Sequence, residues 1–179
     1  MWNEQIIMML LEGIKDTLYM TLTSTLIGYV IGLPMGILLT VTDKDGIHPN
    51  TAVYKVLDVI ANLIRSVPFL ILLIVLIPFT RFLIGRSYGP TATIVPLVIA
   101  AAPYIARMVE SSLKEVDAGV IEAARSMGAS NFTIVTKVML VEARTSLIVG
   151  ATISLGTILG YSACLLYTSP SPRDPKTSR

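Results

Sequence analysis

The sequence is poor in the residues that carry most enzymatic and metal chemistry. Its 179 residues include one cysteine, Cys164, and one histidine, His48. A single cysteine excludes an internal disulfide, and a lone histidine in a turn-like segment does not make a metal site. The His and the Cys lie on different expected elements, so no Cys/His or Ser/His/Asp set can form. We therefore expect no catalytic residue, no metal site and no enzyme activity.

Charge is scarce as well. Charged residues make up 15% of the chain, against roughly 25% in soluble domains. The net charge of +2 is too small to predict nucleic acid as a partner. The chain also lacks a glycine-rich phosphate loop of the GxxxxGK[ST] type. No cofactor is therefore expected in this chain.

Apolar residues are abundant and gather in long blocks. They make up 53% of the chain, and the mean hydropathy is +0.72. Residues 17–41 carry no charge and are long enough as a helix to cross a bilayer. We predict an all-α, polytopic membrane domain over residues 1–166. Its four spans are expected at residues 17–41, 67–84, 91–106 and 145–166, with an amphipathic helix at the membrane surface over 53–65 and a polar loop over 107–144.

Small residues recur along the first predicted span. Gly28, Gly32 and Gly36 are four residues apart and would form one smooth helical stripe. Such a stripe lets another helix approach closely. We favour packing within the chain over a dedicated dimer seam.

Basic residues predict the orientation in the membrane. If the polar loop is cytoplasmic, its five basic residues lie on the same side as Lys44, Lys55 and Arg65, against only Lys15, Arg81 and Arg86 on the other side. Basic residues favour the cytoplasmic side. The loop is therefore predicted inside and the N-terminus outside.

The polar loop has the signals of two short helices. Asp117 is a candidate N-cap for a helix that begins near Gly119, and Gly128 is placed to end it with a positive φ. Ser130 or Asn131 would cap a second helix that runs through Val138. The loop is either a helix that docks onto another protein or a plain surface hairpin between spans. In the first case, Ala123 and Ala124 would leave a thin surface for close approach.

The spacing within this loop decides between these interpretations. Glu122-Ala123-Ala124 is followed after three residues by Gly128, and after nine more by Val138-Met139-Leu140. The pattern resembles the EAA loop of ABC-importer permeases, with Val141 in place of the family's proline. The segments that begin at Arg65, Ile94 and Gly119, together with Gly160 to Ala163, resemble the methionine-import branch. The similarity extends from about residue 17 to residue 163.

The resemblance implies a type I ABC-importer permease fold in a bacterial inner membrane. It implies a homodimer with a second permease copy, a cytoplasmic ATPase subunit that carries ATP and Mg²⁺, and a periplasmic or lipid-anchored substrate-binding protein, all surrounded by membrane lipid. By matching positions, Glu122, Ala123, Ala124 and Gly128 would couple ATPase closure to alternating access. Tyr161 and Ser162 would line the substrate path, or else form interhelical hydrogen bonds.

The end of the chain departs from the family. After Ala163 the family continues with a glycine-rich segment and a fifth span, whereas this sequence passes into a Ser/Pro-rich tail. We expect residues 167–179 to be disordered and to be non-native sequence from a truncation. Two alternatives stay open beside the methionine importer. One is a non-transporting membrane scaffold or inert fragment, and the other is a permease for a different amino acid.

Overall fold

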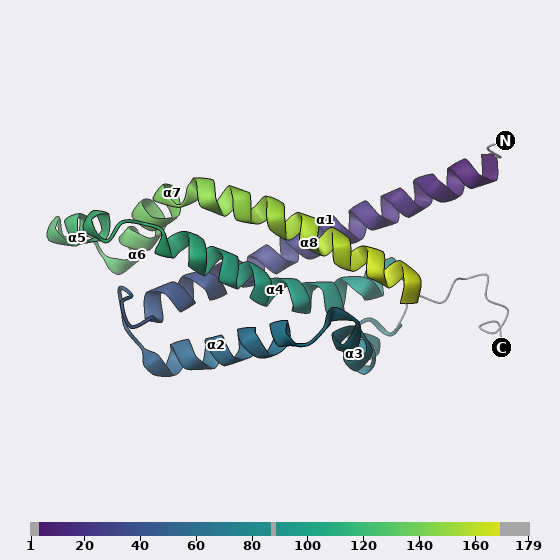
Figure 1. Ribbon diagram of the computed structural model, residues 1–179, viewed down its shortest axis with the longest axis horizontal. Helices are drawn as coiled ribbons and strands as arrows, with labels where there is room; N and C mark the ends of the chain where they lie inside the picture. The colour runs from purple at the N-terminus through teal and green to yellow at the C-terminus, as the bar shows by residue number, and fades with distance from the viewer. Residues whose placement is uncertain (1–3, 87–88, 169–179) are drawn as a thin grey trace.

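The computed structural model describes residues 4–86 and 89–168, and every regular element within these ranges is helical. The prediction of an all-α protein is therefore confirmed. The elements are α1 (Glu4–Thr42), α2 (Thr51–Ser66), α3 (Phe69–Ile84), α4 (Pro90–Lys114), α5 (Ala118–Ser126), α6 (Asn131–Thr133), the π-helical segment η1 (Ile134–Met139), α7 (Leu140–Glu142) and α8 (Arg144–Thr168). Four of them, α1, α2, α4 and α8, run along the long axis of the molecule (Figure 1).

Helix α4 lies at the centre of the bundle and contacts α1, α2, α3 and α8. The glycine stripe of α1 packs directly on it. A Cβ added at Gly32 would lie 2.7 Å from the carbonyl oxygen of Ala102, and one added at Gly36 would lie 2.6 Å from that of Ala106. The two backbones therefore approach too closely for any side chain in between. The stripe belongs to the core of this chain, while the opposite face of α1 exposes large apolar side chains, among them Leu22, Leu26 and Val30.

The second crossing differs from the prediction. Helices α1, α4 and residues Arg144–Cys164 of α8 are each long and apolar enough to span a membrane, whereas α2 and α3 reach that standard only as a pair bent by 108°. The elbow falls at Val67, which is extended, and Pro68, which caps α3. A residue before proline is disfavoured in a helix, so the chain turns there. Helix α3 nearly matches the bounds of the predicted span over 67–84 but reaches the length of a crossing only together with α2, so that span stays a prediction.

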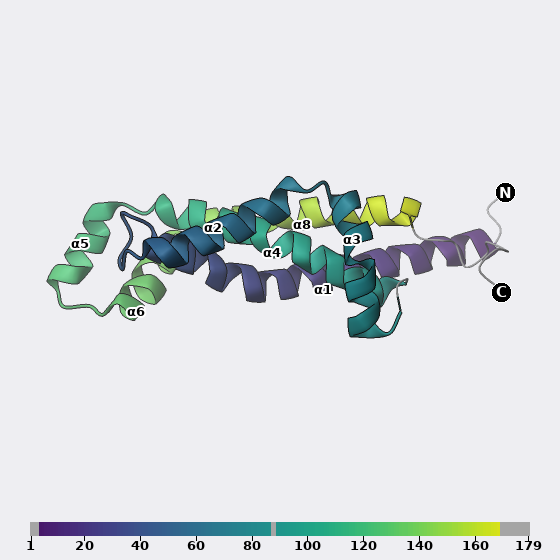
Figure 2. The same cartoon turned by 90° about the horizontal axis from the view of Figure 1, so that it is seen from below.

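Helix α2, which was predicted as an amphipathic helix at the membrane surface, lies along the bundle (Figure 1). It runs beside α4, and α3 turns away across the end of the bundle (Figure 2). The polar side chains Tyr54 and Asp58 of α2 face α4, whereas Val56 and Leu63 are exposed. This pattern puts the polar side against protein and the apolar side outward, which suits lipid surroundings. The sequence showed an amphipathic helix but could not show that its polar side packs on the protein and its apolar side faces outward.

The last helix extends slightly further than predicted. Helix α8 begins at Arg144 and includes Tyr167 and Thr168, so the tail expected over 167–179 is wrong at its first two residues. The rest of that tail lies outside the described residues. The first helix also begins earlier than the predicted span at residue 17, because α1 runs without interruption from Glu4 to Thr42.

Candidate functional site

The predicted docking helix exists as α5, and its ends are fixed by local chemistry. The Asp117 carboxylate accepts a hydrogen bond of 2.7 Å from the Gly119 amide at the start of the helix. At the other end the Ala129 amide donates to the Ala124 carbonyl over 3.1 Å, and the Gly128 amide donates to the Arg125 carbonyl over 2.9 Å. These bonds form a Schellman motif, which requires a left-handed residue after the helix. Gly128 provides it with φ +80°.

The two sides of α5 have different surroundings. Ile121 and Ala124 pack on the apolar cluster that includes Ile134 and Val135 of η1, and Ala124 is 4% exposed. Glu122 and Ala123 are exposed on the other side. The expectation that both alanines form an outer surface is therefore wrong for Ala124, which seats the helix on its own chain. Only Glu122 and Ala123 of the E-A-A triplet remain accessible to a partner.

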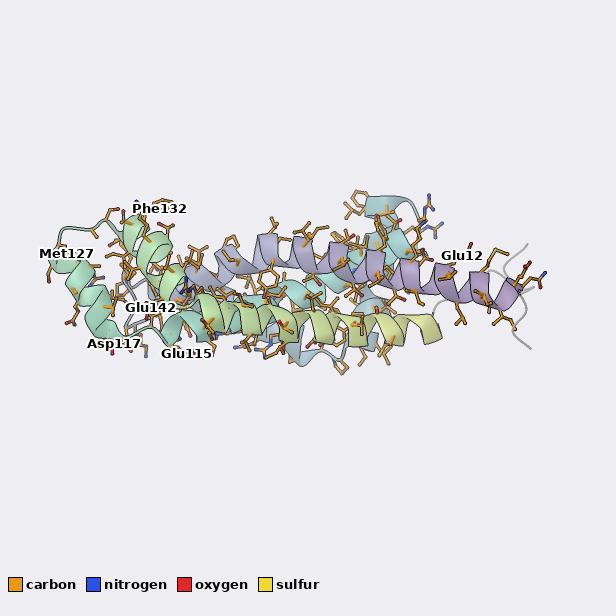
Figure 3. All side chains as sticks on the ribbon, turned by 90° about the horizontal axis from the view of Figure 1, so that it is seen from above. Glu12, Glu115, Asp117, Met127, Phe132 and Glu142 are labelled. Atoms are coloured by element: carbon orange, nitrogen blue, oxygen red, sulfur yellow. The ribbon has the colours of Figure 1, made fainter. Side chains whose placement is uncertain are left out.

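The turn after α5 carries two large exposed apolar side chains. Met127 is 82% exposed and Phe132 is 78% exposed. They flank the turn that ends in the Ser130 N-cap, whose hydroxyl accepts from the Thr133 amide. Both lie at the extreme end of the molecule, beyond the long helices (Figure 3). Prediction from the sequence missed them, although an apolar residue on each side of a Gly-x-Ser turn in a polar loop was a visible signal.

A network of charged groups joins the last turns of α4 to α2 and the α1–α2 loop. Glu110, with its side chain only 6% exposed, accepts from Arg107 at 2.7 Å and from Lys114 at 2.8 Å. Arg107 also pairs with Asp58 of α2, and Lys114 pairs with Asp43 of the α1–α2 loop at 2.6 Å. The hydrogen bond from Lys114 holds the pKa of Asp43 below its usual range. The network thus ties α2 and the α1–α2 loop to the last turns of α4.

A second tie reaches α5 itself. One guanidinium nitrogen of Arg125, Nη2, donates a hydrogen bond of 2.8 Å to the carbonyl oxygen of Ile47. Ile47 belongs to the α1–α2 loop and packs against the apolar cluster. The sequence could not show this contact, because its partners are 78 positions apart and the acceptor is a backbone group.

The two predicted path-lining residues have other surroundings in the described part of the chain. The Tyr161 ring stacks on Phe69 of α3, with the ring centres 4.6 Å apart. Ser162 is 1% exposed and donates a hydrogen bond of 2.7 Å to the Leu159 carbonyl of its own helix. Within the described part of the chain, the Ser162 hydroxyl thus donates inside its own helix, and the choice between path lining and interhelical hydrogen bonds stays open. Whether either residue lines a path in an assembled transporter stays a prediction.

The polar groups of the site hold segments of the chain in place. Among residues 4–86 and 89–168, no group of three His, Cys, Asp or Glu side chains is placed to hold a metal ion. The polar groups of the site instead cap a helix, pair with one another or tie segments together. What the site offers a partner is a short, firmly seated helix with a carboxylate, a small residue and two apolar side chains on its open side.

Comparisons with known proteins agree with this architecture. The family described as "Binding-protein-dependent transport system inner membrane component" matches residues 8–172. The D-methionine transport system permease protein MetI of Salmonella typhimurium is 50% identical over 161 residues, which cover 90% of this chain and 74% of that protein. The protein of the same name from Escherichia coli K12 is also 50% identical, with the same coverage.

A solved structure shows the same fold. It is described as an inward-facing conformation of the MetNI methionine ABC transporter, with a TM-score of 0.91 and 48% identity, covering 93% of this chain and 77% of the solved one. An amino acid ABC transporter solved with histidines has a TM-score of 0.67 at 24% identity, and that likeness shows the fold alone.

Apolar helices long enough to cross a membrane, with a capped polar helix at one end of the bundle, are the architecture of a membrane protein that docks a partner. The chain belongs to the family of inner-membrane components of binding-protein-dependent transport systems. Within that family, the resemblance to the methionine-import branch of ABC permeases is confirmed by relatives that are themselves transport permeases.

Proposed function

We propose that this chain is the membrane-spanning subunit of an ATP-driven methionine importer and that α5 is its coupling helix. The observation that carries the proposal is the open side of α5. Glu122 and Ala123 are exposed there, and Met127 and Phe132 extend the surface at the end of the bundle. Methionine as substrate is supported by the names of relatives that share about half of their residues with this chain.

The partners follow from the same proposal. A cytoplasmic ATPase subunit, with ATP and Mg²⁺ bound, receives α5 in a groove, which is a common way to bind a short helix. A second permease copy and a substrate-binding protein on the outer side complete the importer. The chain itself catalyses no reaction, and α5 lies on the cytoplasmic side.

The way α5 is held suits the transmission of force. Its caps and its buried side make it a compact body, so a partner that grips the open side moves the whole helix. Helix α4 leads into α5, and η1 follows it towards α8. Movement of α5 therefore displaces the ends of two long helices, and these can exchange inward-facing and outward-facing arrangements.

The test is uptake of labelled methionine into proteoliposomes that contain the permease, its ATPase and its binding protein. Glu122→Arg is expected to abolish ATP-dependent uptake while membrane insertion is retained, because it places a cation where the surface presents a carboxylate. Glu142→Arg, an exposed acid outside α5, is the control. Normal uptake by Glu122→Arg would contradict the coupling role. If another unlabelled amino acid inhibited the uptake more strongly than unlabelled methionine does, methionine would not be the preferred substrate.

A further inference from the structure

The α1–α2 loop is built as a firm extension of the two helices that it joins. The His48 amide donates to the Val41 carbonyl over 3.0 Å, and the Asn50 amide donates to the Thr42 carbonyl over 3.0 Å. Asn50 also caps α2 through its side chain. A Cβ at Gly46 would collide with the carbonyl oxygens of Thr40 and Val41, so the loop folds tightly onto the end of α1.

This firm loop is tied at two points to the polar end of the bundle. Asp43 pairs with Lys114 at the end of α4, and Ile47 accepts the 2.8 Å hydrogen bond from Arg125 of α5. The first tie holds the loop to the helix that precedes α5. The second joins the loop to α5 itself, from a residue next to the E-A-A triplet.

We propose that Arg125 is a positioning residue that braces the coupling helix against the α1–α2 loop. The inference rests on the proposed function of α5. Without the brace, a movement of α5 reaches α4 and α8 through the chain, and it reaches the loop only indirectly, through α4 and the pair of Lys114 and Asp43. With it, the same movement also displaces Ile47, and through the firm loop it reaches α1 and α2. All four long helices then respond to one partner.

The choice of arginine fits this role. Its guanidinium carries several donors in a planar fork, so the bond to a carbonyl tolerates small shifts in direction. The acceptor is a backbone oxygen, so the brace depends on where the loop lies rather than on a particular side chain at position 47.

Hydrogen exchange in the complete complex with its ATPase tests the brace directly. In the unmodified protein, ATP is expected to change amide exchange both in α5 and in residues 43–50. In Arg125→Ala the change in α5 is expected to remain and the change in residues 43–50 to become clearly smaller, because only the pair of Asp43 and Lys114 still ties the loop to this end. A change in residues 43–50 that is undiminished in Arg125→Ala would overturn the brace alone. Failure of the unmodified chain to bind any ATPase would overturn the proposed function and the brace together.

Transport gives a readout that loss of stability would not mimic. Arg125→Ala is expected to keep ATPase binding and ATP hydrolysis but to lower the methionine transported per ATP by roughly fivefold or more, the lower range of coupling between sites. Arg125→Lys, which keeps one charged donor, is expected to recover part of the loss. Arg144→Ala, another exposed arginine at the start of α8, is the control and is expected to transport normally. Equal transport per ATP in Arg125→Ala and the unmodified protein would contradict the proposal.

A cross-link between two introduced cysteines tests whether Arg125 acts as a brace or through direct contact with the ATPase. Arg125→Cys and His48→Cys are combined with Cys164→Ser, and the two new thiols are joined by a flexible bis-maleimide. His48 is exposed and adjacent to Ile47. A brace predicts that the cross-link restores the transport per ATP that Arg125→Cys alone has lost. If the cross-linked protein stays uncoupled, Arg125 acts on the ATPase and not on the loop.

Discussion

Two glycines of this protein lie in opposite surroundings, and the difference predicts opposite effects of the same substitution. Gly32 faces α4, where a Cβ would lie 2.9 Å from the Cβ of Ile105 as well as close to the Ala102 carbonyl. At Gly156 of α8, nothing lies within 4 Å of an added Cβ. A methyl group at the first position must push two helices apart. At the second it meets open space.

We therefore expect Gly32→Ala to destabilise the bundle by about 1–3 kcal/mol, the usual cost of overpacking a core. Gly156→Ala is the matched control and should leave stability unchanged or slightly raised, because alanine favours a helix over glycine. The measurement is the thermal unfolding temperature of both variants in detergent, taken as the temperature at which the monodisperse peak in size-exclusion chromatography is lost. Equal unfolding temperatures would show that α1 and α4 do not pack through this stripe.

Exposed apolar side chains at the end of the molecule formed by α5 and α6 provide the second prediction at this scale. Met127 and Phe132 are more exposed than is usual for large apolar residues in a polar loop. If they anchor the ATPase, Met127→Ser and Phe132→Ser should each weaken its binding by about 1–2 kcal/mol, or roughly tenfold in Kd. Phe82→Ser is the control, since Phe82 is 88% exposed but lies on α3. ATPase titration of the permease in nanodiscs measures Kd, and an equal loss in the control would point to a general effect on solubility.

At the scale of elements, the charge network decides how α2 and α4 stay together. Glu110 is the most buried member and receives bonds from both Arg107 and Lys114. In Glu110→Gln both cations lose this carboxylate, although Arg107 keeps Asp58 and Lys114 keeps Asp43. An unsatisfied buried polar group costs about 1–3 kcal/mol, and the remaining partners keep the loss in that range. We expect thermal unfolding to occur at a lower temperature, with Glu115→Gln, an exposed acid, as the unaffected control.

Helix α5 and the charge network show where prediction from the sequence succeeded and where it could not. Helix α5 was predicted with its cap at Asp117 and its positive φ at Gly128, because these signals lie within a few residues of the structure that they determine. The pair of Arg107 and Asp58 joins residues 49 positions apart, and no local pattern identifies it. The elbow before α3 was missed for a related reason, because the apolar run from Val67 shows that the segment prefers lipid but not its direction.

At the scale of the whole molecule, the directions of the helices determine how often the chain can cross the membrane. The tip formed by α5 and α6 lies at one end and α3 at the other (Figures 1 and 2). Helices α1 and α4 run parallel, because successive glycines of α1 meet successively later residues of α4. Two parallel crossings require the chain to return between them, and α2 does so. If α1 and α4 both cross the membrane, the bent pair of α2 and α3 is one crossing, and the described residues contain up to four.

The topology can be measured with single thiols in a Cys164→Ser background. Phe132→Cys, at the tip beyond η1, should react with a membrane-impermeant maleimide only in inside-out vesicles, because the excess of basic residues favours a cytoplasmic position for this end. Phe82→Cys, on α3 at the opposite end, should react only in right-side-out vesicles. Both side chains are highly exposed on the protein, so the protein itself does not bury either thiol, and labelling of both thiols in detergent is the control for coverage by lipid. Labelling of both thiols from the same side would show that α2 does not cross, and α3 would then belong at the cytoplasmic surface with α5.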